Sequence, residues 1–350
     1  MKNIKKLPFI LSIISLLTIF SPANAEIKVV ASIKPIHSLA SYLMDGVSKP
    51  DLIVDGYASP HGFAMKPSHA KMLQNADLIF WVGEDLENFL KKPLKSIAKK
   101  AEKIELMEIK GLTKLEFRER NIFEEHGHDE HKEHGHKEDK HDEHKHDEHK
   151  EHGHKEDKHD DHHGHAHGEN DPHIWLDPMN AKVILSEMAE HLIENDQENA
   201  SKYKANLKKA QKDLDKLTKK VKSQLNKDFK SIVFHDAYQY FEKRFDVNVL
   251  GAFTVNTDVL PGAEQLSEIR EVIEHEKVSC VFSEPQFNPD IIKAVAKDTN
   301  IKTGVIDPLG ATLNPGKTLY FDLISNMSKS FKGCYEYLKK NLIKNNFNIN

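Results

Sequence analysis

The residues between Glu124 and Gly168 are the densest group of potential metal ligands in the chain. These 45 positions hold 16 His, 16 Asp or Glu, 7 Lys, five Gly and one Ala, and residues 128–142 recur letter for letter as residues 146–160. Imidazole binds zinc, copper and nickel, with carboxylate as a general partner. No apolar side chain larger than alanine is present, so this His-rich segment cannot build a core. We interpret it as a solvated loop that offers many ligands to metal ions, and an inert spacer is the alternative.

Three of the seven histidines outside the His-rich segment stand where a binding cleft would form. His61 lies in the loop after a predicted strand, His235 follows another strand, and His173 comes just after the His-rich segment. In open α/β sheets, ligands bind beyond the carboxyl ends of the strands. Asp307 and Glu284 follow two further predicted strands, so we expect both to face the same cleft. Taken alone, each histidine would more commonly be a core or surface residue.

The strands and helices that would position these residues are predicted from short β-rich runs that alternate with helical patterns. Four runs precede the His-rich segment and four follow it, at residues 27–32, 52–54, 78–82, 104–107, 231–234, 247–250, 278–282 and 303–306. Such alternation is typical of parallel sheets covered by helices. The sequence therefore predicts an α/β fold of two lobes, each with a parallel four-stranded sheet.

A long helix is predicted between the two lobes. Apolar residues recur at steps of three and four from Ala200 to Leu225, and Asp196 is the expected N-cap. A helix of about 30 residues would run ~45 Å, which is enough to bridge both lobes as a rigid spine. A coiled-coil dimer seam is the alternative use of the same stripe.

The N-terminus has the pattern of a secretory signal peptide. Lys2, Lys5 and Lys6 precede an apolar run at residues 7–20, and residues 23–25 form a small-x-small cleavage site. The run is shorter than the ~20 residues of a bilayer span. We expect cleavage before Glu26 and export to a periplasm.

The chain contains two cysteines, which could form a disulfide. The even count, Cys280 and Cys334, predicts one disulfide in an oxidising compartment, and a pair of thiol ligands is the alternative.

The formal net charge is −5, and the His-rich segment alone contributes −9. The rest is only slightly positive, so the chain has no sign of the basic face that nucleic-acid binding requires.

A family resemblance is carried by residues 31–35, 59–68, 73–78, 81–83, 173–178, 234–238, 240–242, 262–263, 282–287 and 307–310. These segments together resemble the periplasmic zinc-binding components of bacterial zinc-uptake ABC transporters, in the cluster A-I or cluster 9 metal-binding family. The acidic His-rich segment before His173 is typical of the zinc branch, and the cysteine pair resembles the C-lobe disulfide of some zinc members.

The resemblance implies metal ligands at His61, His173 and His235. Manganese members usually carry Glu where this chain has His235, and neutral imidazoles favour zinc over the oxygen-preferring manganese. Some zinc members place a Glu before the first histidine, where this chain has Pro60. The fourth ligand is therefore left open between Asp307, a water and a histidine of the His-rich segment.

The implied function is capture of one Zn²⁺, as transported ligand, in the cleft between the lobes and its delivery to an ABC permease. We expect a monomer without enzymatic activity, whose rigid helix limits lobe closure. The alternatives are a manganese or nickel carrier of the same fold, a periplasmic zinc store, or a hydrolase that activates water on a three-histidine zinc. The predicted domains are a signal peptide 1–25, an N-terminal lobe 26–185, a linker helix region 186–228 and a C-terminal lobe 229–350.

Overall fold

The computed structural model describes residues 26–123, 169–225, 228–257, 259–299 and 301–347, with side chains as far as residue 336. The predicted signal peptide and the His-rich segment lie outside these residues, so the statements made about them stay predictions. Across the described residues, every helix is too short or too polar to span a membrane.

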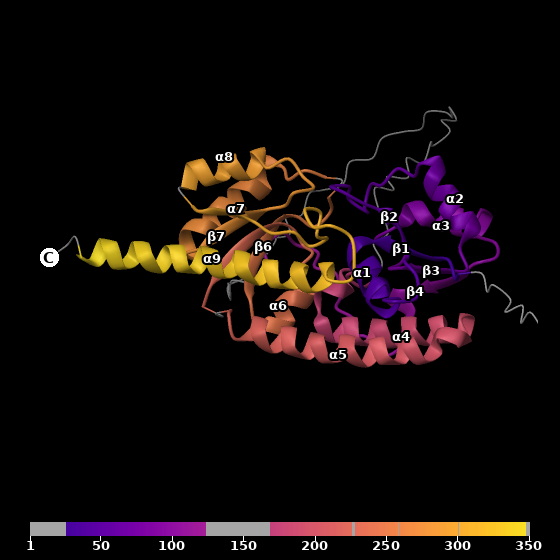
Figure 1. The fold of residues 1–350 in the computed structure, drawn as a ribbon. Coiled ribbons are helices and arrows are strands. Elements are labelled where there is room, and N and C mark those ends of the chain that lie inside the picture. The colour runs from indigo at the N-terminus through magenta and orange to yellow at the C-terminus, as the bar shows by residue number, and fades with distance from the viewer. Residues whose placement is uncertain (1–25, 124–168, 226–227, 258, 300, 348–350) are drawn as a thin grey trace, which may run out of the picture.

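The N-terminal lobe is built on a parallel sheet with the strand order β2-β1-β3-β4 (Figure 1). All residues of β1 and β3 are buried, because strands covered by helices on both faces have no solvated side. The elements are β1 (Val29–Ile33), α1 (Lys34–Leu43), β2 (Asp51–Val54), α2 (Pro67–Asn75), β3 (Leu78–Trp81), α3 (Asn88–Ser96) and β4 (Glu102–Glu105).

The C-terminal lobe repeats this topology with the strand order β6-β5-β7-β8. Its elements are β5 (Lys230–His235), α6 (Gln239–Phe245), β6 (Asn248–Thr254), α7 (Ala263–His275), β7 (Cys280–Ser283), α8 (Asp290–Thr299) and β8 (Thr303–Val305). All eight predicted strands are present, with ends that differ by a few residues, and the predicted fold class is confirmed.

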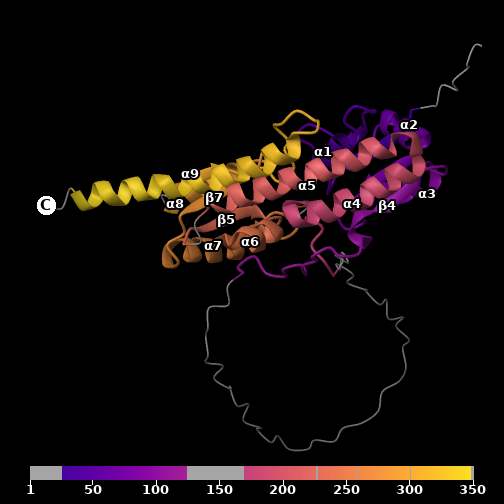
Figure 2. The ribbon, with the colours of Figure 1, turned by 60° about the horizontal axis from the view of Figure 1, so that its bottom comes forward.

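Three long helices run beside the two sheets (Figures 1 and 2). They are α4 (Pro178–Asn195), α5 (Ala200–Lys222) and α9 (Leu319–Phe347). Helix α5 packs against α4, against α1 of the N-terminal lobe and against α9, which reaches β8 of the C-terminal lobe. The predicted stripe is buried within this chain at Tyr203, Ala210, Leu214, Leu217 and Val221, so it does not form a dimer seam. The predicted boundary at residue 185 falls inside α4, and the domain limits stay a prediction.

The predicted start of α5 was wrong. Asp196 ends α4, and the three-residue turn η3 (Gln197–Asn199) separates it from α5, which is 23 residues long. The Asp196 carboxylate accepts hydrogen bonds from Tyr203 Oη at 2.6 Å and from Asn199 Nδ2 at 2.9 Å. Asp196 therefore fixes the corner between the two helices instead of capping the second one.

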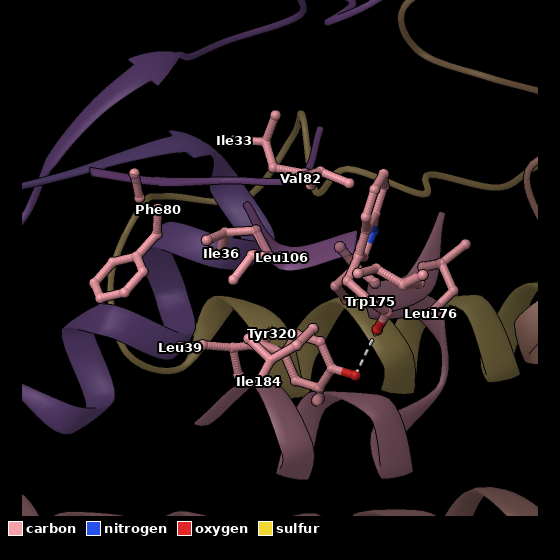
Figure 3. Packing of buried hydrophobic residues seen from close by; sticks show 14 of the residues in the cluster. Ile33, Ile36, Leu39, Phe80, Val82, Leu106, Trp175, Leu176, Ile184 and Tyr320 are labelled. Carbon is pink, nitrogen blue, oxygen red and sulfur yellow. Dashed lines mark hydrogen bonds between the residues drawn. The ribbon is translucent and has the colours of Figure 1, made fainter. Parts of the chain in front are cut away.

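One hydrophobic cluster extends through both lobes. It includes Ile33 and Phe80 of the N-terminal sheet, Tyr238 after β5 and Phe282 of β7. Figure 3 shows the centre of its N-terminal part, where Trp175 packs near Val82 and Leu176. A hydrophobic core that both lobes share resists their separation, because protein interiors are packed as densely as organic crystals. This continuity supports the expectation of limited lobe closure.

Two further links join distant parts of the chain. Cys280 of β7 and Cys334 of α9 form the predicted disulfide, with their Cα atoms 6.1 Å apart. The segment before the His-rich segment crosses to the C-terminal lobe, where Phe123 N donates to Leu250 O at 2.8 Å and Ala252 N donates to Asn121 O at 2.8 Å. The lobes are therefore tied together by main-chain pairing as well as by the core.

Candidate metal centre

The structure brings His61, His173 and His235 together from three separate parts of the chain. His61 lies in the loop between β2 and α2, His173 precedes the short helix η2 (Ile174–Leu176), and His235 is the last residue of β5. One ligand nitrogen from each ring lies within 4.8 Å of the other two, and among the described residues these three form the group that can hold a metal ion.

The spacing of the two buried rings matches tetrahedral coordination. The Nε2 atoms of His173 and His235 lie 3.4 Å apart. Two nitrogens bound to zinc at about 2.0–2.1 Å and a tetrahedral angle would lie about 3.3–3.4 Å apart. His61 is only half-buried and sits on a loop, so its ring can approach the other two without any change in the sheets.

A buried carboxylate fixes each of these two rings. Asp171 Oδ1 accepts a hydrogen bond from His173 Nδ1 at 2.6 Å, and Glu284 Oε1 accepts one from His235 Nδ1 at 2.7 Å. Both contacts place the proton on Nδ1 and leave Nε2 as the free acceptor that a metal needs. Glu284 follows β7, next to β5 in the sheet, so the bond crosses the point where the strand order reverses.

Burial and charge act differently on the two rings. Burial lowers the pKa of His173 well below its usual value, and the neighbouring His235 adds to this shift. Burial also acts to lower the pKa of His235, but Glu284, with Asp236 and Asp171, acts in the opposite direction and the net pKa is raised. Asp171 and Glu284 lie behind the two rings, at the Nδ1 atoms. Their negative charge would offset part of the charge of a divalent ion bound at the two Nε2 atoms, which lowers the cost of burying that ion.

The positively charged Arg118 side chain lies among the buried carboxyl groups around the candidate centre. Arg118 contacts Asp236 Oδ1 at 3.0 Å and Glu242 Oε2 at 2.8 Å, and its guanidinium lies 3.9 Å from the centre of the Phe123 ring. Burial raises the pKa of Asp171, Asp236 and Glu242 to about 7 each. The positive charge of Arg118 opposes these shifts, so it helps to keep the three carboxyl groups ionised.

The space between the rings is small and mostly apolar. It amounts to about 10 Å³, which is room for about one water or ion. Its walls include Trp175, whose ring centre lies 5.3 Å from that of His173, and Phe287, at 5.8 Å from His235. Trp175 is held in turn by a hydrogen bond from its Nε1 to Pro308 O at 2.8 Å.

Asp307 stands outside the three-histidine group. Its Oδ1 accepts hydrogen bonds from Gln286 Nε2 at 3.1 Å and Leu309 N at 3.2 Å, and its Oδ2 accepts one from Thr312 N at 3.3 Å. Its neighbours Pro308 and Leu309 line the cavity, so Asp307 lies just behind the wall. Its assignment as fourth ligand stays a prediction.

The sequence interpretation gave no role to three residues that shape this centre: Asp171, Trp175 and Gln286. Asp171 carried the clearest signal, because a carboxylate two residues before a candidate ligand can reach its ring. Trp175 and Gln286 depend on contacts with Pro308 and Asp307, which lie 133 and 21 residues away, and nothing in their local sequence predicts these contacts.

Comparison with known proteins gives consistent matches over most of the chain. The family model for the periplasmic zinc-uptake complex component A, ZnuA, matches residues 29–334. The chain is 48% identical over 308 residues to the high-affinity zinc uptake system protein ZnuA of Brucella abortus (strain 2308), covering 87% of this chain and 91% of the relative. It is 37% identical over 330 residues to the protein of the same name from Yersinia pestis, covering 91% and 95%.

Solved structures show the same fold at lower identity. A crystal structure of ZnuA superposes with a TM-score of 0.66 and 20% identity, covering 88% of this chain and 100% of that one. A manganese-bound periplasmic metal binding protein from Candidatus Liberibacter asiaticus gives a TM-score of 0.65 and 18% identity, covering 88% and 98%. The fold is therefore shared by structures described as zinc-bound and as manganese-bound.

Proposed function

Because this chain belongs to the family of periplasmic zinc-uptake components, we propose that it captures Zn²⁺ between its two lobes and delivers the ion to an ABC permease. The observation that carries the proposal is the convergence of His61, His173 and His235, with one ligand nitrogen of each ring within 4.8 Å of the other two. The relatives' description as high-affinity zinc uptake proteins supports the same reading.

The donor set favours zinc over manganese. Three imidazoles supply borderline nitrogen ligands, whereas manganese prefers carboxylate, carbonyl and water oxygens. The 3.4 Å between two of the Nε2 atoms also fits the tetrahedral geometry that zinc adopts in proteins. Nitrogen ligands alone do not reject copper, so selectivity against copper rests on its scarcity in the compartment or on the geometry of the site.

The size of the site supports transport rather than catalysis. A cavity with room for about one water or ion leaves no space for an organic substrate beside the metal. Zinc is therefore the transported ligand in this proposal, and the protein works as a monomer in the periplasm. The His-rich segment serves as a weak collector that raises the local zinc concentration near the tight site.

The function is tested by metal content and by growth. Protein isolated natively from the periplasm should carry one tightly bound zinc, measured by elemental analysis after removal of weak metal with a mild chelator. Cells that lack this protein should grow poorly when zinc is scarce and recover with the wild-type gene but not with His235→Ala. His275→Ala is the matched control, since His275 is exposed at the end of α7. A different tightly held metal, or growth that does not depend on the gene, would contradict the proposal.

A further inference from the structure

Gln286 stands between the metal cavity and the carboxylate of Asp307. It lies two residues after Glu284 and lines the cavity together with the three histidines. Its Nε2 donates to Asp307 Oδ1 at 3.1 Å. The side chain therefore links the cavity wall to the Asp307 carboxylate.

The orientation of this amide follows from its partner. An ionised carboxylate only accepts hydrogen bonds, so the NH₂ end of Gln286 must face Asp307. The carbonyl end, Oε1, is then turned away, and it is buried without a hydrogen-bond donor among the described residues. An amide oxygen at the cavity wall suits a donor bound in the cavity, such as a water on the metal ion.

The main chain around Asp307 is held by contacts that do not involve Gln286. The buried Lys34 ammonium donates to Gly310 O at 3.3 Å, Ala311 O at 3.0 Å and Leu313 O at 3.0 Å. Trp175 binds Pro308 O, on the other side of the same turn. The backbone position of Asp307 is thus fixed. Its carboxylate also accepts hydrogen bonds from Leu309 N and Thr312 N, and Gln286 is its partner on the cavity side.

We propose that Gln286 determines the metal preference of this centre by holding the Asp307 carboxylate outside the coordination sphere. The fourth position then goes to a water that donates to Gln286 Oε1, and the ion has three nitrogen ligands and one neutral oxygen. Release of Asp307 would add an anionic oxygen ligand, which favours manganese relative to zinc. This inference rests on the proposed zinc function and identifies the residue that sets its selectivity.

A double-mutant cycle tests the proposal. The four proteins are wild type, Gln286→Leu, Asp307→Asn and the double variant, each titrated with zinc and with manganese against a chelator of known affinity. In Gln286→Leu the ratio of manganese to zinc affinity should rise by about 10- to 100-fold, the range seen when an outer partner of a metal site is lost. Asp307→Asn alone should change zinc affinity by less than about tenfold, because its carboxylate is not a ligand in the wild type.

The double variant provides the decisive comparison. If the released carboxylate causes the gain in manganese affinity, that gain must disappear when Asp307 is also replaced. An unchanged metal ratio in Gln286→Leu, or a gain that persists in the double variant, overturns the role of Gln286. A strong loss of zinc affinity in Asp307→Asn alone also overturns it, since Asp307 would then be a ligand in the wild type.

Two controls keep the outcomes separate. Gln286→Met removes the donor with little change in size and adds no charge, so it should shift the metal ratio in the same direction, and it replaces Gln286→Leu if that variant fails to fold. Wild-type protein that binds no zinc tightly would refute the proposed function itself. A crystal structure of zinc-loaded wild type should show a water, and not Asp307, at the fourth position.

Discussion

Two buried glutamates stand at matching places in the two lobes but have different functions. Each follows the third strand of its sheet, Glu87 after β3 and Glu284 after β7, and their exposed fractions are 0% and 3%. Glu87 Oε2 accepts hydrogen bonds from Val82 N at 2.7 Å and Gly83 N at 3.1 Å, so it holds the turn after its own strand. Glu284 instead fixes a histidine ring on the neighbouring strand.

The comparison shows that a buried carboxylate does not by itself mark a functional site. Burial raises the pKa of Glu87 to about 7, the same value that Asp171 has beside the candidate metal centre. The difference lies in the partner, which is a pair of backbone amides in one case and an imidazole in the other. A perturbed pKa therefore identifies a functional residue only together with the geometry around it.

Loss of a ligand ring should have the largest effect on the metal site. His173→Ala and His235→Ala should each weaken tight zinc binding by more than about 100-fold, because an inner ligand matters more than the outer partners whose loss costs 10- to 100-fold. Chelator-competition titration measures the change, with circular dichroism to check the fold. Tight binding that survives in His235→Ala would show that this residue is not a ligand.

Replacement of the buried carboxylates Glu284, Asp171 and Glu87 should distinguish the two that orient a histidine ring from the one that does not. Glu284→Gln and Asp171→Asn remove the charge that orients a ligand ring, so zinc affinity should fall by about 10- to 100-fold. Glu87→Gln should leave zinc affinity unchanged, since Glu87 contacts no ligand. The same titration serves all three variants. Equal losses in Glu87→Gln and Glu284→Gln would mean that both act through general stability.

The pH dependence of stability should identify Glu87. Its pKa is about 7 in the folded protein and about 4.5 when unfolded, so the folded state binds the proton more tightly. Stability from this group is complete below pH 4.5, is lost as the pH rises through 7, and amounts to about 3 kcal/mol at most. Glutamine does not titrate, so metal-free Glu87→Gln should gain in melting temperature over the wild type between pH 5 and pH 8.

Thermal unfolding at several pH values measures this difference. A gain of a few degrees is expected, because an unfolding entropy of about 2.1 cal/mol/K per residue corresponds to roughly 1.5–2 °C per kcal/mol for about 300 folded residues. Asp236 and Glu242 titrate in the same range, but they are present in both proteins and cancel in the comparison. A melting-temperature difference that does not change with pH would show that Glu87 is ionised throughout.

Deletion of the His-rich segment should have the smallest effect on the tight site. With residues 124–168 replaced by a short Gly/Ser linker, total zinc per chain should fall while the tight dissociation constant stays the same. Each site formed by flexible chain must order residues at a cost of roughly 1–2 kcal/mol apiece, so the lost sites are the weak ones. Isothermal titration distinguishes the two classes, and loss of the tight event would mean that a histidine of this segment completes the centre.

Local sequence patterns were sufficient to predict the two sheets. The apolar runs at β3 and β7 and the stripe of α5 reflect burial on a face, which repeats along a strand or helix and can be read from a few neighbouring residues. The strand-end positions and the family resemblance also identified His61, His173 and His235 as a set. The ends of elements were less certain, and Asp196 was misplaced because a short turn and the end of a helix carry similar residues.

Only the tertiary structure decided what surrounds those histidines. His235 meets Glu284 across 49 residues of sequence, Trp175 meets Pro308 across 133, and Arg118 meets Glu242 across 124. Such contacts depend on strand order and on the packing of one lobe against the other, which no periodic pattern records. The sequence by itself determined the types of the candidate ligand residues and the strands of the two sheets. The fold determined the distances, the burial and the buried charges, because these arise from residues that are close in space but far apart in the chain.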